Sequence, residues 1–216
     1  MSFRFDEHEF RARASRLFSQ PPDVPRRSDD DLNPDARIIP PGISPKPAAV
    51  LVPLVVRNEG LNLLLTQRTD HLSRHAGQVA FPGGRIDDTD ESPVMAALRE
   101  TEEETGIDRR FVEPVGFLDT YLTGTSYRVV PVVGLLRPGF TVTPHAGEVA
   151  AVFEVPLAFL MNPAHHRRHI AELADGPRAF LSMPWQVAGA DGVPREYFIW
   201  GATAAMLRNL YRFLAG

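Results

Sequence analysis

The spacing of apolar residues predicts helices near both ends of the chain and strands over most of its middle. Residues 7–18 carry apolar side chains at helical spacing, and residues 202–214 carry a second stripe of the same kind. Runs of apolar residues bounded by turn residues predict strands at 48–56, 61–67, 113–122, 127–137, 147–155, 178–185 and 194–200. A short helix is expected at 156–161. Strands mixed with two principal helices favour an α/β sandwich.

Residues 19–47 lie between the first helix and the first strand and differ in composition. Pro and Asp are frequent there. Because such a segment buries little apolar surface, it predicts an extended or mobile linker. We therefore divide the chain into an N-terminal helix with a Pro-rich extension, residues 1–46, and a main domain, residues 47–216.

Residues 81–107 contain the clearest local signals. The Phe-Pro-Gly-Gly sequence at 81–84 ends a strand and opens a loop. Ser92 and Pro93 suit the start of a helix, because serine caps a helix and proline is tolerated in its first turn. Gly106 suits the end of that helix, since glycine adopts the left-handed conformation easily. The segment predicts a strand, a glycine turn, an acidic loop and one short helix.

Three glutamates of this helix are predicted to lie on one face. Glu100, Glu103 and Glu104 are spaced i, i+3 and i+4, so their side chains are neighbours. Like charges at this spacing cost about a few tenths of a kcal/mol per pair. A hard divalent cation such as Mg²⁺ or Mn²⁺ relieves that repulsion. Glu102 projects to the other side. The alternative for the three is an ordinary solvated acidic face.

This segment resembles the Nudix box, whose consensus is G-x5-E-x7-R-E-U-x-E-E-x-G-U, where U is a bulky apolar residue. The matching positions are Gly84, Glu91, Arg99, Glu100, Glu103, Glu104, Gly106 and Ile107. Six residues rather than five separate the first two, and Thr101 stands at the first U position, where its methyl group can still pack. The resemblance implies a Nudix-type α/β/α sandwich with a mixed sheet, acting as a metal-dependent pyrophosphate hydrolase.

The residues before the box are similar to a second signature, that of the coenzyme A pyrophosphatase branch, L-L-T-x-R-[SA]-x3-R-x3-G-x3-F-P-G-G. The matching positions are Leu64, Leu65, Thr66, Arg68, Gly77, Phe81, Pro82, Gly83 and Gly84. Thr69 stands where Ser or Ala is usual. Ser73 stands at the expected Arg, and Arg74 follows one place later. The likeness continues to the last helix and covers roughly residues 47–212.

The resemblance implies a role for each residue of the acidic site. Glu100, Glu103 and Glu104 are expected to bind Mg²⁺ or Mn²⁺. One of these glutamates, or Glu148 ahead of a later strand, is expected to take the proton from the attacking water. A solvated glutamate at a strand end is an equal alternative for Glu148.

The remaining residues of the box are expected to shape its loop. Arg99 is expected to point away from the metal face and to brace the loop by pairing with Glu91. Gly83 and Gly84 allow the backbone to approach a phosphate closely, so both are expected to bind substrate.

The substrate implied by the resemblance is coenzyme A or one of its thioesters. Water would cleave the pyrophosphate to give 3′,5′-ADP and 4′-phosphopantetheine or its acyl form. Arg68 and Arg74 belong to a basic group expected to contact a phosphate of the ligand, with a solvated edge as the alternative. The other functions considered are hydrolysis of ADP-ribose or another nucleoside diphosphate derivative, and a non-catalytic nucleotide-binding sensor. The retained glutamates disfavour the sensor.

Composition sets bounds that agree with this interpretation. A chain of 216 residues with 44% hydrophobic and 23% charged residues is typical of one globular domain with an extension. The net charge of −4 gives no general nucleic-acid footprint, and the lack of cysteine excludes disulfides. With no signal-peptide core and no run long enough to span a membrane, the cytoplasm is the expected location. Family members often dimerise, so a homodimer is an expectation, although no segment marks an interface.

Two other features are assigned ordinary structural roles. His165 and His169 are spaced i, i+4, but with no cysteine and no H-E-x-x-H pattern a zinc site is disfavoured. Phe198 and Trp200 are expected in the core rather than on a platform for base stacking.

Overall fold

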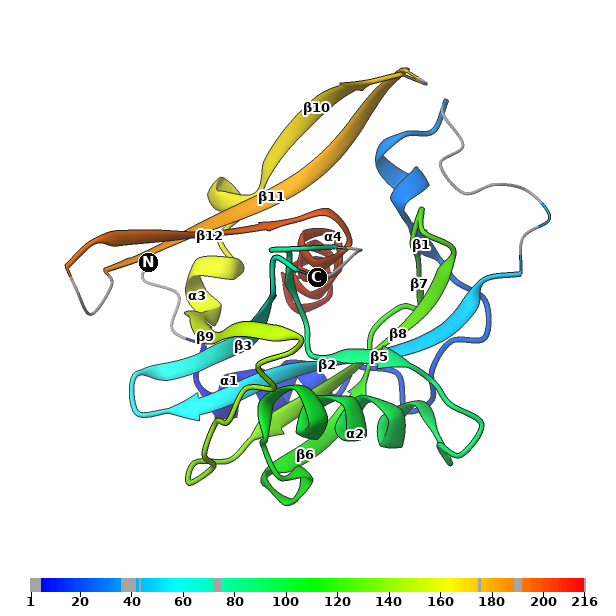
Figure 1. Cartoon of the computed structure of the whole chain (residues 1–216). Helices are drawn as coiled ribbons and strands as arrows, with labels where there is room; N and C mark the ends of the chain where they lie inside the picture. The colour runs from blue at the N-terminus through cyan, green and yellow to red at the C-terminus, as the bar shows by residue number, and fades with distance from the viewer. Residues whose placement is uncertain are drawn as a thin grey trace.

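The computed structural model describes residues 5–35, 42, 44–71, 75–174, 176–188 and 192–215 (Figure 1). The helices are α1 (Glu7–Ala14), α2 (Pro93–Thr105), α3 (Leu157–Leu160) and α4 (Gly201–Ala215), with 3₁₀ turns η1 (Asp29–Leu32), η2 (Arg109–Phe111) and η3 (Pro163–His165). The strands are β1 (Arg27–Ser28), β2 (Lys46–Arg57), β3 (Gly60–Arg68), β4 (Val79–Ala80), β5 (Gly83–Arg85), β6 (Val112–Phe117), β7 (Tyr121–Leu122), β8 (Tyr127–Leu136), β9 (Val149–Pro156), β10 (Arg167–Leu173), β11 (Gly176–Ala188) and β12 (Pro194–Trp200). The first helix is shorter than predicted, and the strand predicted at 113–122 is divided into β6 and β7.

The larger sheet is mixed and has β2 at its centre. Its strands run in the order β1-β7-β8-β2-β3-β4, while β5 pairs with β2, β6 with β8, and β9 with β3. β2 is parallel to β8 and antiparallel to β3 and β5. Because β2 is buried on both faces, its sequence is almost continuously apolar rather than alternating.

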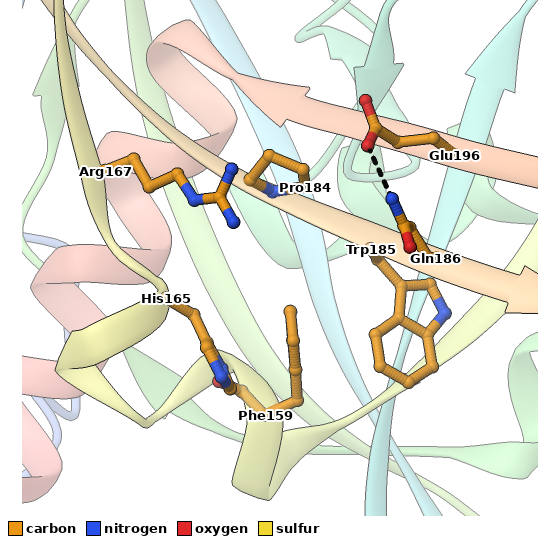
Figure 2. A pocket seen from close by; sticks show the side chains of 7 residues that line it. All are labelled: Phe159, His165, Arg167, Pro184, Trp185, Gln186 and Glu196. Atoms are coloured by element: carbon orange, nitrogen blue, oxygen red, sulfur yellow. Dashed lines mark hydrogen bonds between the residues drawn. The ribbon is translucent and has the colours of Figure 1, made fainter.

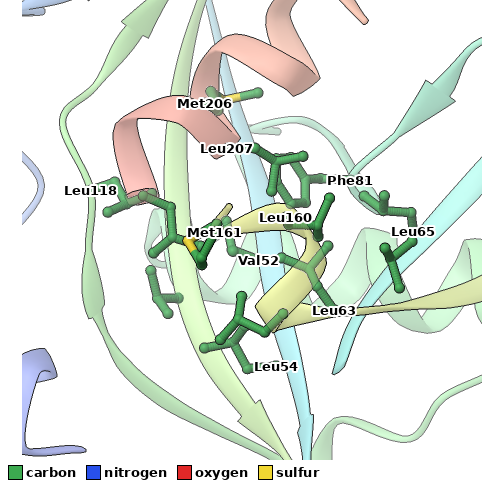
Figure 3. Packing of buried hydrophobic residues seen from close by; sticks show 14 of the residues in the cluster. Val52, Leu54, Leu63, Leu65, Phe81, Leu118, Leu160, Met161, Met206 and Leu207 are labelled. Carbon is green, nitrogen blue, oxygen red and sulfur yellow. The ribbon is translucent and has the colours of Figure 1, made fainter. Parts of the chain in front are cut away.

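Helices cover both faces of this sheet. On one face, Leu51 and Val55 of β2 pack with Leu98 of α2. On the other face, Val52 belongs to a larger cluster with Leu160 of α3 and Leu207 of α4 (Figure 3). Residues of α1 belong to the same cluster. The predicted α/β/α sandwich with a mixed sheet is therefore confirmed.

Strands β10, β11 and β12 form a separate antiparallel sheet beside α4 (Figure 1). Met183 and Ile199 on one of its faces are fully buried. Phe198 and Trp200 are both 37% exposed, because strand alternation turns them to the opposite face. The prediction that these two residues belong to the core is wrong. The sequence did not predict β10, whose mostly exposed residues show no apolar alternation.

The predicted linker is partly built into the fold. After α1 the chain forms β1, which pairs with β7, and then the turn η1. The Asn33 side chain donates to the carbonyl of Ala179 on β11 at 3.0 Å and accepts from its N–H at 2.7 Å. Residues 36–41 and 43 of the segment lie outside the described residues. Within the described chain, no helix combines the length and apolar character needed to cross a bilayer.

Candidate active site

Helix α2 begins and ends where the sequence predicts. The Ser92 hydroxyl accepts from the Met95 N–H at 3.2 Å, and Pro93 occupies the first turn. At the other end, Gly106 has a φ of 71° and donates to the Glu102 carbonyl at 2.8 Å. These caps fix the helix, and with it the angular positions of its glutamates.

The glycine pair on β5 fits closely against this helix. Gly84 lies opposite Ala49 of β2, and a Cβ at Gly84 would come within 2.5–2.6 Å of the Glu100 carboxyl atoms. Gly83 has a φ of 148°, and a Cβ there would come within 2.5 Å of the Ala49 carbonyl oxygen. Both glycines thus make room inside the protein, one for a carboxylate and one for the central strand. Their expected contact with substrate stays a prediction.

Glu104 is the buried carboxylate of the site, with only 5% of the residue exposed. Burial raises the pKa of Glu104 to about 8, and the carboxylates of Glu100 and Glu148 act in the same direction. The Gly83 N–H, which donates to Glu104 at 3.3 Å, and the guanidinium of Arg68 oppose this rise. Glu100, Glu104 and Glu148 therefore influence one another electrostatically.

Arg68 stands beside this buried carboxylate at the end of β3. Its Nη1 is 4.0 Å from the Glu104 Oε1, and its Nε is buried without a hydrogen-bond partner among the described residues. The strand pairing between β3 and β9 shifts register at this residue. Arg74, the other predicted substrate-binding arginine, lies outside the described residues.

The loop that carries Glu148 is attached to the end of α2. The N–H groups of Thr143 and His145 donate to the carbonyls of Thr105 and Glu104 at 2.8 and 2.9 Å. Glu148 then donates its own N–H to the His145 carbonyl at 2.9 Å and immediately precedes β9. These backbone bonds hold the exposed Glu148 at a fixed place relative to the helix.

Arg99 holds the acidic loop against α2, but through a different partner from the one expected. Its Nε and Nη2 donate to the Asp90 carboxylate at 3.1 and 2.9 Å, and this pairing lowers the pKa of Asp90. The predicted pairing with Glu91 is wrong. Glu91 instead lines a hollow of about 230 Å³ beside Arg99 and Met95. Both Asp90 and Glu91 lie in one acidic run, so the sequence offered no signal to choose between them.

Arg99 also faces the glutamates rather than pointing away from them. Its Nη1 lies 3.1 Å from the Glu100 Oε1 and 3.1 Å from the Glu103 Oε2. The two carboxylates thus converge on one positive group, and Glu103 is otherwise open to solvent, with 59% of its side chain exposed.

The donor set fits a divalent cation in its chemistry. Carboxylate oxygens are the ligands that Mg²⁺ and Mn²⁺ prefer, and Glu100, Glu103 and Glu104 supply them from one helix. The described residues hold no group of three acidic or histidine side chains already arranged around a single point. Glu103 has the most exposed side chain of the three glutamates, so it is the one most free to rotate.

A second hollow, of about 310 Å³, lies elsewhere, between the small sheet and η3 (Figure 2). The lining residues are Phe159, His165, Arg167, Pro184, Trp185, Gln186 and Glu196. His165 bonds the Phe159 carbonyl at 2.9 Å, whereas His169 bonds the Ser182 hydroxyl at 2.7 Å. The two histidines thus have separate hydrogen-bond partners.

Comparison with known proteins identifies the class to which this fold and acidic helix belong. The chain matches the model of the NUDIX domain over residues 45–173. It is 46% identical over 164 residues to the uncharacterized Nudix hydrolase NudL of Escherichia coli O7:K1, and equally to that of strain K12, with 76% of this chain and 80% of the relative covered. A solved Ap4A hydrolase of C. elegans is similar at 23% identity with a TM-score of 0.45, covering 51% of this chain and 80% of that one.

The chain therefore belongs to the Nudix hydrolase family. It is a pyrophosphohydrolase, and Nudix hydrolases generally need divalent metal ions, usually Mg²⁺ or Mn²⁺.

Proposed function

We propose that the protein hydrolyses the pyrophosphate bond of coenzyme A or its thioesters, giving 3′,5′-ADP and 4′-phosphopantetheine or its acyl form. The signature between Leu64 and Gly84 supports this substrate class. The observation that carries the proposal is the position of Arg68, the arginine of that signature, 4.0 Å from the buried Glu104. The Arg68 guanidinium, whose buried Nε has no hydrogen-bond partner among the described residues, suits the oxygens of a pyrophosphate.

The reaction adds water across the anhydride. The water oxygen forms a bond to one phosphorus, the bond from that phosphorus to the bridging oxygen breaks, and the bridging oxygen leaves with the other phosphate. In this proposal Glu100, Glu103 and Glu104 hold Mg²⁺ or Mn²⁺, which supplies neutralisation of phosphoryl charge and acidification of a bound water. Arg68 orients the pyrophosphate, and Glu104 or Glu148 receives the proton.

A substrate panel tests the proposal. Purified protein is given coenzyme A, acetyl-coenzyme A, ADP-ribose, NADH and nucleoside triphosphates, each with Mg²⁺ and with Mn²⁺, and the products are identified by mass. We expect kcat/KM for coenzyme A or its thioester to exceed that for ADP-ribose by at least about tenfold. Faster turnover of ADP-ribose than of coenzyme A would refute the proposed substrate and support the alternative, a nucleoside diphosphate derivative.

The role of Arg68 has its own test. Because Arg68 lies beside Glu104, we place it on the scissile pyrophosphate rather than on the 3′-phosphate. Arg68→Ala should then lower kcat/KM equally for coenzyme A and for 3′-dephospho-coenzyme A. Gln67→Ala, the neighbouring substitution on the same strand, serves as the control. A loss of kcat/KM for coenzyme A alone would show that Arg68 contacts the 3′-phosphate instead of the pyrophosphate.

A further inference from the structure

Strand β10 forms an open edge of the small sheet. Within the described residues it has a strand neighbour, β11, on one side only. The edge of β11 that faces away from β10 is covered. Residues 182–188 of that edge pair with β12, and the Asn33 amide binds the backbone N–H and C=O of Ala179. An uncovered edge strand offers its outward N–H and C=O groups to another strand.

The bonds to Asn33 reveal which β10 groups point outward. Ala179 directs its N–H and C=O toward Asn33, away from β10, so Ala179 and its opposite residue Ile170 form a non-hydrogen-bonded pair. The backbone groups of Ile170 therefore also point away from β11. Since this orientation alternates along a strand, Arg168 and Glu172 share it.

These same three residues form a self-complementary pattern. Ile170 is 62% exposed, and Arg168 and Glu172 are exposed on either side of it. The two charged residues are about 13 Å apart along the strand, too far to pair within one chain. Across the sheet they face Leu181 and Pro177, which carry no charge. In an antiparallel second copy centred on Ile170, Arg168 would lie opposite Glu172 twice, with Ile170 against Ile170.

We propose that β10 is a homodimer interface, in which two copies pair antiparallel through this edge and join their three-stranded sheets into one. Arg168, Ile170 and Glu172 each exchange backbone hydrogen bonds with the second copy. Two symmetric ion pairs flank the central isoleucines, as an isologous two-fold contact requires. The interface uses no residue of α2, so it is independent of the substrate that the enzyme hydrolyses.

Charge reversal and restoration test this interface. Sedimentation velocity of the full chain should give the mass of a dimer. Arg168→Glu should raise the dimer dissociation constant at least about tenfold, because two attractions become two repulsions. Adding Glu172→Arg to the same chain should restore dimerisation. Arg167→Glu is the matched control, since it makes the same change of charge one residue away, on the other face of the strand.

A second variant keeps the proposal open to refutation if charges contribute little. Ile170→Pro removes an outward N–H that β11 does not use, so the monomer should fold while the dimer is lost. Far-ultraviolet circular dichroism checks the fold. A monomeric wild-type chain at high concentration would overturn the proposal. So would a dimer that survives both Arg168→Glu and Ile170→Pro, because it would use another surface.

Discussion

Replacing Gly84 by alanine should lower the activity of the enzyme while leaving its stability nearly unchanged. The new Cβ would lie 2.5–2.6 Å from the Glu100 carboxyl atoms, whereas ordinary carbon contacts are about 3.5–4.0 Å. The φ of Gly84 is one that alanine accepts, and the obstacle is the end of a flexible, half-buried side chain. Glu100 must therefore move by about 1 Å, and a displacement of that size at a catalytic group costs about 100-fold in rate.

Gly83→Ala provides the matched comparison. Here the Cβ would meet the Ala49 carbonyl oxygen at 2.5 Å and the Val50 Cα at 2.6 Å, and φ is 148°. Backbone atoms of the central strand cannot step aside, and alanine is strained at that φ. Strain and overpacking together cost about 3 kcal/mol, which lowers the melting temperature by about 6–12 °C for a chain of this size.

Three measurements distinguish the variants. Thermal unfolding without metal should leave Gly84→Ala near wild type and lower the melting temperature of Gly83→Ala. Hydrolysis with Mg²⁺ and titration with Mn²⁺ should show lost activity and weaker metal binding for Gly84→Ala. If Gly84→Ala retained wild-type kcat/KM and Mn²⁺ affinity, Glu100 would not need the space that this glycine leaves, and the reasoning would be wrong.

Three further predictions concern charges around the site and on the surface. Glu103→Gln should keep the fold, because the side chain is 59% exposed, and lose at least about 100-fold in kcat; Glu102→Gln is the control, and equal losses would end the ligand assignment. In Arg99→Lys the lysine cannot hold the loop and two helix glutamates at once, so kcat/KM should fall about tenfold. An unchanged kcat/KM would show that these contacts of Arg99 are not needed for activity. Arg11 lowers the pKa of Glu113, so this ion pair stabilises fully above the ordinary value of 4.5 and is lost as pH falls. The pair is largely exposed, so the effect should be small and disappear in high salt; acid melting curves that do not respond to salt would contradict it.

The sequence predicted the parts of the site that depend on near neighbours. The start of α2 at Ser92 and its end at Gly106 follow from residues within the helix and its caps. Once the ends are fixed, the 3.6-residue period places Glu100 and Glu104 on one side. Most of the longer strands were found for the same reason, since apolar runs between turn residues are local features.

The wrong or missing predictions depended on how loops turn and how elements pack, which the local pattern does not show. Arg99 pairs with Asp90 rather than Glu91 because a turn in the loop brings the Asp90 carboxylate to the Asp87 N–H at 2.9 Å. Asn33 contacts Ala179 across 146 positions, which composition cannot reveal. Trp200 was expected in the core because it is large and apolar, but the small sheet buries only one of its faces.

The backbone clamp between α2 and the loop before β9 has a consequence for protein engineering. The Thr143 N–H is bound to the Thr105 carbonyl, which fixes the chain at this point. The length of the loop before Thr143 therefore does not set the position of Glu148. Residues 141 and 142 are exposed and directly precede this anchor. A tag or fluorescent reporter inserted between them should leave the catalytic face undisturbed, whereas one extra residue between His145 and Glu148 should displace the glutamate.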